Sequence, residues 1–229
     1  MSNILALDTS ALTATAAVIK DGLVAAEVSF TTGLTHSQTI MPMVDYCLKG
    51  AGLTPGDIDL YAVSSGPGSF TGLRIGVGTA KAMAYACDKK CVGVPTLLAL
   101  AHNIAYDGLI VPIMDARRSQ VYCAAYRRSG NELTEVLPPD ALSVAELCSR
   151  IDEKAVFVGD GVEAYMGQIS EILKDRAVFA PTQLRLQRAA SVGVAALNLE
   201  GVSPDELSVI YLRKPQAERE REERLNNNH

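Results

Sequence analysis

The sequence predicts an α/β protein made of two similar lobes with mixed sheets. Predicted strands alternate with predicted helices along the 229 residues, and each half opens with two neighbouring strands. The stretches NILALDTSALTATAAVIK, from Asn3, and LIVPIMDARRSQVYCAAYRR, from Leu109, both read as an apolar strand, an aspartate, about six residues and a second strand. One supersecondary unit is therefore expected twice. We assign a first lobe to residues 1–106 and a second to 107–229, whose last helix or tail can return to the first lobe.

Composition excludes several function classes. No apolar run approaches the roughly 18 residues of a membrane span, and the N-terminus lacks the basic start of a signal peptide, so a cytoplasmic protein is expected. A net charge of −5 and an aromatic content of 5% argue against strong nucleic-acid binding by this chain alone. The five cysteines are expected to be reduced and mostly buried, with no zinc site. They are Cys47, Cys87, Cys91, Cys123 and Cys148.

The first half opens with a strand, a hairpin and a helix. Asp21-Gly22 joins the two hairpin strands. The apolar face of the helix has the spacing i, i+3, i+4, i+7, i+8. Its residues are Ile40, Met43, Val44, Cys47 and Leu48. Pro42 either kinks this helix or marks its first turn, and Gly50 and Gly52 end it.

The remaining elements follow in order. A buried strand, DLYAVSSGPGS, leads into a helix from Phe70 to about Ala86, and a short strand, CVGVP, leads into a helix capped by Thr96. The second half then predicts a helix over 144–151, the strand AVFVGDG, and two more helices. We expect these over residues 163–173 and 184–201. The charged tail, from Glu206 onward, is predicted to be a solvated helix or a frayed end.

The glycine-rich stretch SSGPGSFTGLRIGVG matches neither of the two common phosphate-binding motifs. A P-loop requires Lys and then Ser or Thr directly after its last glycine, whereas Leu and Arg follow Gly72. A dinucleotide-binding fingerprint accommodates Gly66 and Gly68, but Thr71 stands where its third glycine belongs. The glycines therefore need another explanation.

A row of small residues continues past this loop, four residues apart on one face of the predicted helix. The row consists of Gly72, Gly76, Ala80 and Ala84. Glycine inside a helix is less favourable than alanine by about 1 kcal/mol, so close approach of another backbone must offset it. The residues leave two alternatives equally open: the row packs against the chain's own sheet, or it docks the helix of a partner.

Several motifs resemble those of the bacterial TsaB family, also called YeaZ. They are ILALDTS, THSQTIMPMVDYCL, SSGPGSFTGLRIGVGTAKAMA, VPTLLALA, DARRSQVYCAAY and VIYLRKP, and they run in order over nearly the whole chain. GPGSFTGLRIG is the most specific of them. The resemblance implies the actin-like fold of sugar kinases and Hsp70-type ATPases, with two RNase H-like lobes.

The resemblance also implies a function. A TsaB protein is a required, non-catalytic subunit that dimerises with its paralogue TsaD and works with the small ATPase TsaE. The complex transfers a threonylcarbamoyl group to the adenosine beside the anticodon of tRNAs reading codons that begin with A. We expect tRNA to bind through the complex, and we expect this chain to form a homodimer as well. ATP is expected to be used by the complex, and no cofactor is assigned to this chain. No metal is expected, because His36, His102 and His229 lack the spacing of TsaD's histidine pair.

In the family, the partner contact uses the helices that follow His36 and the glycine loop. The implied interface residues are His36, Ile40, Met43, Val44, Cys47, Phe70, Gly72, Leu73, Gly76, Val77, Ala80 and Ala84. The cleft that holds ATP in other members of the fold lacks glycines here, since the first loop is DTSALTA and Ala116 stands in the second. The residues of this vestigial nucleotide cleft are Asp8, Thr9, Ser10, Asp115, Gly159 and Gly161.

Other functions receive less support. An ATP-dependent phosphotransferase of the same fold is the main alternative, and the missing glycines argue against it. A peptidase would need a nucleophile with a base in reach, and Ser69 has no visible histidine partner. Four basic residues are candidate RNA or nucleotide contacts, with solvated surface as the simpler interpretation. They are Arg117, Arg118, Arg213 and Lys214.

Overall fold

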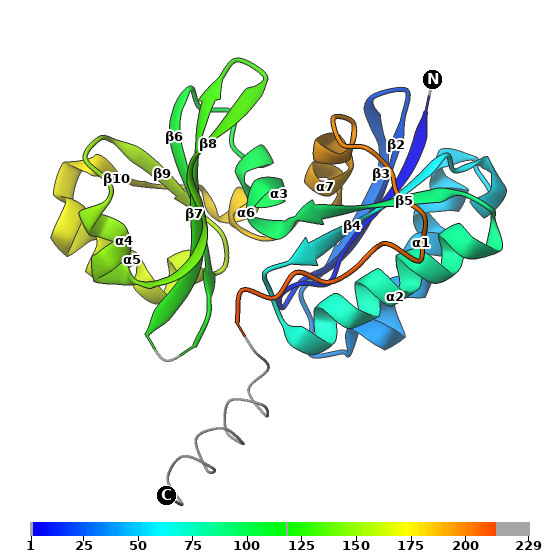
Figure 1. Ribbon diagram of the computed structural model, residues 1–229, viewed down its shortest axis with the longest axis horizontal. Coiled ribbons are helices and arrows are strands. Elements are labelled where there is room, and N and C mark those ends of the chain that lie inside the picture. The colour runs from blue at the N-terminus through cyan, green and yellow to red at the C-terminus, as the bar shows by residue number, and fades with distance from the viewer. Residues whose placement is uncertain (1, 118, 214–229) are drawn as a thin grey trace, which may run out of the picture.

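The computed structural model describes residues 2–117 and 119–213, which form two five-stranded sheets flanked by helices (Figure 1). The first sheet contains β1 (Asn3–Asp8), β2 (Ala14–Lys20), β3 (Leu23–Phe30), β4 (Leu60–Gly66) and β5 (Lys90–Pro95). The second contains β6 (Gly108–Asp115), β7 (Gln120–Ser129), β8 (Glu132–Ser143), β9 (Ala155–Val158) and β10 (Ala177–Phe179). Helices and strands alternate in both halves, as predicted.

The two sheets have the same topology. Their strand orders are β3-β2-β1-β4-β5 and β10-β9-β6-β7-β8. In each sheet the first strand pairs antiparallel with the second and parallel with the fourth. The supersecondary unit expected from the sequence therefore does occur twice, and both sheets are mixed.

The helices are short relative to a membrane span. They are α1 (His36–Ala51), α2 (Phe70–Ala86), α3 (Thr96–His102), α4 (Val144–Ser149), α5 (Gly161–Leu173), α6 (Thr182–Arg185) and α7 (Ala189–Ala196). Two 3-10 turns, Pro55–Asp57 and Lys174–Arg176, complete the set. Within residues 2–117 and 119–213, no helix has the length and hydropathy needed to cross a bilayer.

Helices cover both faces of the first sheet. Leu5 and Leu7 of β1 pack under α1 and α2, whereas Ile4 and Ala6 face α7 on the other side. This alternation is the period of two expected of a strand that is buried on both faces. Gly193 lets α7 sit close, because a Cβ there would lie 2.4 Å from the side chain of Ile19. A late segment of the chain thus completes the core of the first sheet.

Local signals set the bounds of the first two helices. Thr35 and Gln38 form a capping box at the start of α1, and Gly52 ends the helix in a left-handed conformation with φ 67°. Pro42 lies beyond the first turn, so the alternative that it marks that turn is wrong. The bounds of α2 agree with the prediction, and the Asp21-Gly22 hairpin is confirmed by left-handed φ angles of 53° and 79°.

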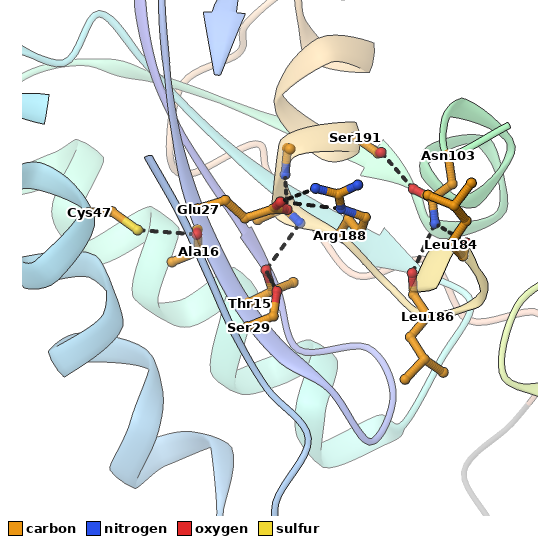
Figure 2. Close-up of polar contacts among 12 residues, drawn as sticks. Thr15, Ala16, Glu27, Ser29, Cys47, Asn103, Leu184, Leu186, Arg188 and Ser191 are labelled. Carbon is orange, nitrogen blue, oxygen red and sulfur yellow. Dashed lines mark hydrogen bonds and ion pairs between the residues drawn. The ribbon is translucent and has the colours of Figure 1, made fainter. Parts of the chain in front are cut away.

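The long helix predicted over residues 184–201 is wrong. Three non-helical residues, 186–188, separate α6 from α7. The helix is interrupted there because the side chains of Gln187 and Arg188 bind residues that are distant in the sequence. Buried Gln187 donates to Asp160 Oδ1 at 3.4 Å, and Arg188 forms an ion pair with Glu27 of β3 (Figure 2). Glu27 also accepts from the backbone N–H of Ala190 at 3.0 Å. Periodicity alone does not reveal such a break.

Pro95, not Thr96, is the N-cap residue of α3, and the buried Thr96 hydroxyl has no hydrogen-bond partner among the described residues. The sequence reasoning missed β8, because Pro138 and Pro139 lower the strand signal; the strand tolerates them at the edge of its sheet, beside a register irregularity. It also missed β10, whose three residues are too few to show a period.

The C-terminal segment, residues 199–213, runs back along the first sheet and α2 (Figure 1). Val202 pairs with Cys91 of β5, Lys81 donates to the carbonyl of Leu207 at 2.9 Å, and the N–H of Ile210 donates to Ser65 at 2.7 Å. The solvated or frayed tail that we predicted is therefore wrong for residues 206–213. Residues 214–229 lie outside the described residues.

Candidate functional site

The glycine loop packs against the β1–β2 turn of its own lobe. A Cβ on Gly68 would lie 2.5 Å from the carbonyl oxygen of Ser10, and one on Gly72 would lie 2.0 Å from that of Thr9. The N–H of Ser69 donates to the Ser10 carbonyl at 2.6 Å, and Thr9 Oγ1 donates to the Gly72 carbonyl at 2.8 Å. The glycines therefore permit contact between two loops of one chain.

The row of small residues faces the same way. A Cβ on Gly76 would lie 2.4 Å from Thr9 Oγ1 and 3.3 Å from the side chain of Val63. Ala80 and Ala84 are fully buried in the first core. Of the two alternatives that the sequence left open, packing against the chain's own sheet is the one observed. The residues of the row do not form a surface that a partner can reach.

The predicted face of α1 is also buried. Ile40, Met43 and Val44 are core residues. Cys47 Sγ lies 3.2 Å from the carbonyl oxygen of Ala16, a contact drawn as a dashed line in Figure 2. Ten of the twelve predicted interface residues are thus inside the first lobe: Ile40, Met43, Val44, Cys47, Gly72, Leu73, Gly76, Val77, Ala80 and Ala84. Apolar spacing correctly found a packed helix face, but the face packs inward.

The exposed faces of α1 and α2 form a different surface, an open groove that we call the helix groove. It is lined by Ser37, Met41, Ile75, Gly78, Thr79, Ala82, Met83 and Ala86, together with Ile40 of the predicted set, whose side chain is almost fully buried. Outside the backbone of α2 itself, no atom of the described residues lies within 4 Å of a Cβ built on Gly78, and Met41 is 47% exposed. Gly78, Ala82 and Ala86 are again spaced by four, and all three are exposed. A second small row therefore lies on the outside of α2.

His36 and Phe70, the other two predicted interface residues, are half-buried at the starts of α1 and α2. Both line a cavity of about 650 Å³ between the two lobes. His36 Nε2 lies 2.7 Å from the carbonyl oxygen of Ala11, whereas its Nδ1 is shielded from solvent and has no partner among the described residues. Ile75 of α2 lines both this cavity and the helix groove.

The cavity only partly matches the predicted vestigial nucleotide cleft. Of its six residues, Ser10 and Asp115 line the cavity, whereas Asp8 and Thr9 are buried behind it. The two glycines of the set, Gly159 and Gly161, pack on the backbone of Ile113, where a Cβ on Gly159 would lie 2.1 Å from the carbonyl oxygen. These glycines contact β6, and neither of them is among the residues that line the cavity.

Hydrogen bonds within the lobe hold the Asp8 carboxylate in place. It accepts from the N–H of Ser10 at 2.8 Å, from Ser10 Oγ at 2.7 Å and from Ser64 Oγ at 2.5 Å. Burial raises the pKa of Asp8, and the hydrogen bonds from Ser10 and Ser64 partly oppose that rise. With three donors from its own lobe and almost no exposed surface, this side chain stabilises the β1–β2 turn.

Asp160 lines the cavity and was not among the predicted cleft residues. Burial raises its pKa to about 6, the hydrogen bond from Gln187 lowers it, and the charges of Asp115 and Asp8 raise it further. The sequence analysis assigned the two glycines of the stretch VGDG to the cleft and passed over the aspartate between them, because a single aspartate in a loop carries little information about a site.

We expect this raised pKa to make stability depend on pH. In the unfolded chain Asp160 loses its proton near its ordinary pKa of 3.8, but in the folded protein only near 6. Its contribution is therefore fully present below pH 3.8 and falls by about 2 kcal/mol as the pH rises to 6. Asp160→Asn should unfold at a higher temperature than the wild type at pH 7, and the two should converge near pH 4. Thermal unfolding across pH 4–7 checks this, and a difference independent of pH would contradict it.

The basic residues around the cavity differ in their contacts. The N–H of Arg117 donates to Asp115 Oδ1 at 2.8 Å, and its side chain is 87% exposed. Arg213, in the C-terminal segment, donates to the carbonyl of Ala116 at 3.3 Å and to Gln120, so it ties that segment to the second lobe. Arg118 and Lys214 lie outside the described residues. The side chain of Arg213 therefore has a structural role, whereas the side chain of Arg117 is exposed on the surface.

Comparison with known proteins gives a consistent result. The family model described as "TsaD: tRNA N6-adenosine threonylcarbamoyltransferase" matches residues 31–219. The chain is similar to the "tRNA threonylcarbamoyladenosine biosynthesis protein TsaB" of Bacillus subtilis, with 32% identity over 94% of this chain and 96% of the relative. The protein of the same name from Escherichia coli is 35% identical over 78% of this chain and 81% of the relative.

Solved structures agree on the fold. YeaZ from Pseudomonas aeruginosa superposes with a TM-score of 0.80 and 26% identity, over 93% of this chain and all of the other. Component A of the (R)-2-hydroxyglutaryl-CoA dehydratase of Acidaminococcus fermentans has a TM-score of 0.50 and 11% identity, over 85% of this chain and 97% of the other, which concerns the fold alone. The expected actin-like α/β fold with two mixed sheets is confirmed.

Proposed function

We propose a function from one premise: this chain belongs to the TsaB family of tRNA threonylcarbamoyladenosine biosynthesis proteins. The chain takes part in making that modified nucleoside. Specifically, it acts as a required, non-catalytic subunit that dimerises with a TsaD-type transferase. A TsaE-type ATPase completes the complex, tRNA binds through the assembled complex, and ATP is used by the complex. The modified adenosine lies beside the anticodon in tRNAs that read codons beginning with A.

One observation carries this proposal: the outer faces of α1 and α2 form an open apolar groove with a row of small residues. Gly78, Ala82 and Ala86 allow a foreign helix to approach the backbone of α2, and Met41 and Met83 supply adaptable apolar contact at its edges. A two-helix docking surface of about 800 Å² on each partner suffices for a specific interface. The same groove would serve a homodimer when the partner is absent.

The corrected surface replaces the one expected from the sequence. The inner rows of α1 and α2 form the core of the first lobe, so the proposed contact uses the outer rows of the same two helices. The proposed contact therefore uses the same two helices that the family resemblance implies, but through the outer side chains of these helices in place of the inner ones. Residues on the outer rows are the ones to substitute in binding experiments.

Reconstitution tests the proposed function. The chain is mixed with TsaD-type and TsaE-type proteins, ATP, threonylcarbamoyl-adenylate and unmodified tRNA, and the modified nucleoside is quantified. Omitting this chain should reduce modification to background, and the chain should co-purify with the TsaD-type protein. Full modification without the chain would contradict a required subunit.

We also expect the isolated chain to bind ATP negligibly. Thr9 and Ser10 of the β1–β2 turn are covered by the glycine loop, and the Asp8 carboxylate is engaged by hydroxyl groups of its own lobe. Backbone N–H groups that would bind phosphate in a sugar kinase are therefore less accessible here. Calorimetric titration with Mg-ATP up to about 1 mM, a range in which ordinary cofactor sites saturate, should show no saturable heat. Saturation in that range would favour the phosphotransferase alternative.

A further inference from the structure

Three side chains form a cluster at the start of α2, near one end of the helix groove. The rings of Phe70 and Tyr211 stack with their centroids 5.1 Å apart. The guanidinium carbon of Arg74 lies 3.9 Å from the centroid of the Phe70 ring, and Arg74 Nε donates to the Tyr211 hydroxyl at 3.1 Å. The exposed guanidinium group is thus held in one orientation by Phe70 on its own helix and by Tyr211, which lies 137 residues after Arg74 in the sequence.

The outer nitrogens of Arg74 remain available. Within residues 2–117 and 119–213, neither Nη atom makes a hydrogen bond, and no carboxylate lies within 4.0 Å. The other cations of α1 and α2 are engaged, since Lys49 pairs with Asp45 at 2.7 Å and Lys81 donates to Leu207. A preoriented guanidinium fork can hold a planar oxyanion through two parallel hydrogen bonds.

The position of Arg74 relates it to the groove. Arg74 precedes Gly78 by four residues and Ala82 by eight, and all three are exposed. Residues at this spacing lie on one face of a helix. Arg74 therefore continues the outer row of α2, and a helix that lies along Gly78 and Ala82 passes the guanidinium group at that end.

We propose that Arg74 binds an aspartate or glutamate side chain on the partner helix that occupies the helix groove. The inference rests on the proposed function, because it names a chemical feature of the partner's helix. An arginine backed by aromatic rings beside an apolar groove is the composition typical of interface residues that dominate binding energy. Phe70 and Tyr211 act as positioning residues, and Tyr211 makes the C-terminal segment part of the docking surface.

A protein carboxylate fits this surface better than an RNA phosphate. Binding to a phosphate backbone generally draws on several cations at once. Here Lys49 and Lys81 already have partners within the chain, Asp45 adds a negative charge on α1, and the whole chain carries a net charge of −5. One available arginine next to an apolar groove matches a single acidic side chain on an apolar helix.

Calorimetric titration of the full chain with the TsaD-type protein, at about 0.15 M salt, tests the proposal. Arg74→Gln should weaken binding about 30-fold or more. Arg74→Lys should weaken it about 10-fold, because an ammonium group cannot form the bidentate pair. Tyr211→Phe should weaken it a few-fold, because the hydrogen bond that orients the guanidinium is lost. The matched control Arg117→Gln removes another exposed arginine and should leave the affinity within two-fold.

A charge exchange identifies the partner group. Arg74→Glu should abolish binding, and replacing one acidic residue of the partner's helix with arginine should restore most of it. Thermal unfolding of each variant alone should match the wild type, which excludes misfolding as the cause.

The outcomes separate the two proposals. If the wild-type chain does not bind the TsaD-type protein, the proposed function fails. If wild type and Arg74→Gln bind equally well, the function stands and the role of Arg74 is overturned. If Arg74→Gln leaves subunit affinity unchanged but weakens retention of tRNA by the assembled complex, the arginine contacts a phosphate and the carboxylate proposal is wrong.

Discussion

Gly72→Ala is expected to lower the free energy of unfolding by about 3 kcal/mol. A Cβ on Gly72 would lie 2.0 Å from the carbonyl oxygen of Thr9, which is backbone and cannot rotate away. The added methyl group must separate the start of α2 from the β1–β2 turn and break the hydrogen bond from Thr9 Oγ1. Chemical denaturation should show a lower midpoint, and the melting temperature should fall by about 6–12 °C.

Gly78→Ala is the matched control in the same helix. In the part of the chain that the structure describes, no neighbouring heavy atom lies within 4 Å of a Cβ at this position, so alanine brings only its higher helix propensity. Stability should rise by about 0.5–1 kcal/mol. If both substitutions destabilise the protein equally, the explanation through contact with Thr9 is incorrect, because helix propensity alone favours alanine at both positions.

Ala82→Trp is expected to weaken binding of the TsaD-type partner more than about 100-fold while the chain stays folded. Ala82 is exposed on the outer row of α2, where an indole ring would fill the helix groove that the partner helix requires. Pull-down and calorimetry measure the loss, and circular dichroism monitors the fold. Ala82→Ser, which keeps the small volume, should bind like the wild type.

The inner row gives the contrasting result. Ala80 is fully buried, two residues away from Ala82, so Ala80→Trp should prevent folding instead of blocking a folded surface. A folded Ala80→Trp variant that had lost partner binding would support the interface that was assigned from the sequence, which uses the inner row. A folded Ala82→Trp variant with normal affinity would move the contact away from the helix groove.

The sequence predicted the fold well because its strongest signals are local. Alternation, the Asp21-Gly22 turn and the glycine at the end of α1 each report on a few neighbouring residues, and all three agree with the structure. The repeated unit was visible because each copy begins with the same strand and aspartate. The break between α6 and α7 was missed because Gln187 and Arg188 bond to residues distant in sequence.

The site was harder to predict, for a physical reason. Periodicity reports which residues of a helix are apolar and small, but not which neighbour they contact. Two rows of small residues run along α2, and within each row the residues are spaced by four. One row passes through Gly76 and Ala80 and the other through Gly78 and Ala82, and both suit close packing. Only the position of Thr9 under Gly72 and Gly76 distinguishes them, and that contact spans more than 60 residues.

The covering of the first sheet by α7 and the C-terminal segment affects how the protein is made. A ribosome releases β1 through β5 long before Ala189–Ala196 exists, and until then Ile4, Ala6 and Ile19 lack the helix that packs on them in the finished fold. The later half of the polypeptide, whose sheet strands all precede α7, can reach its native state first. We expect fragments cut after residue 106 to aggregate, and the nascent N-terminal half to depend on holding chaperones until translation is nearly finished.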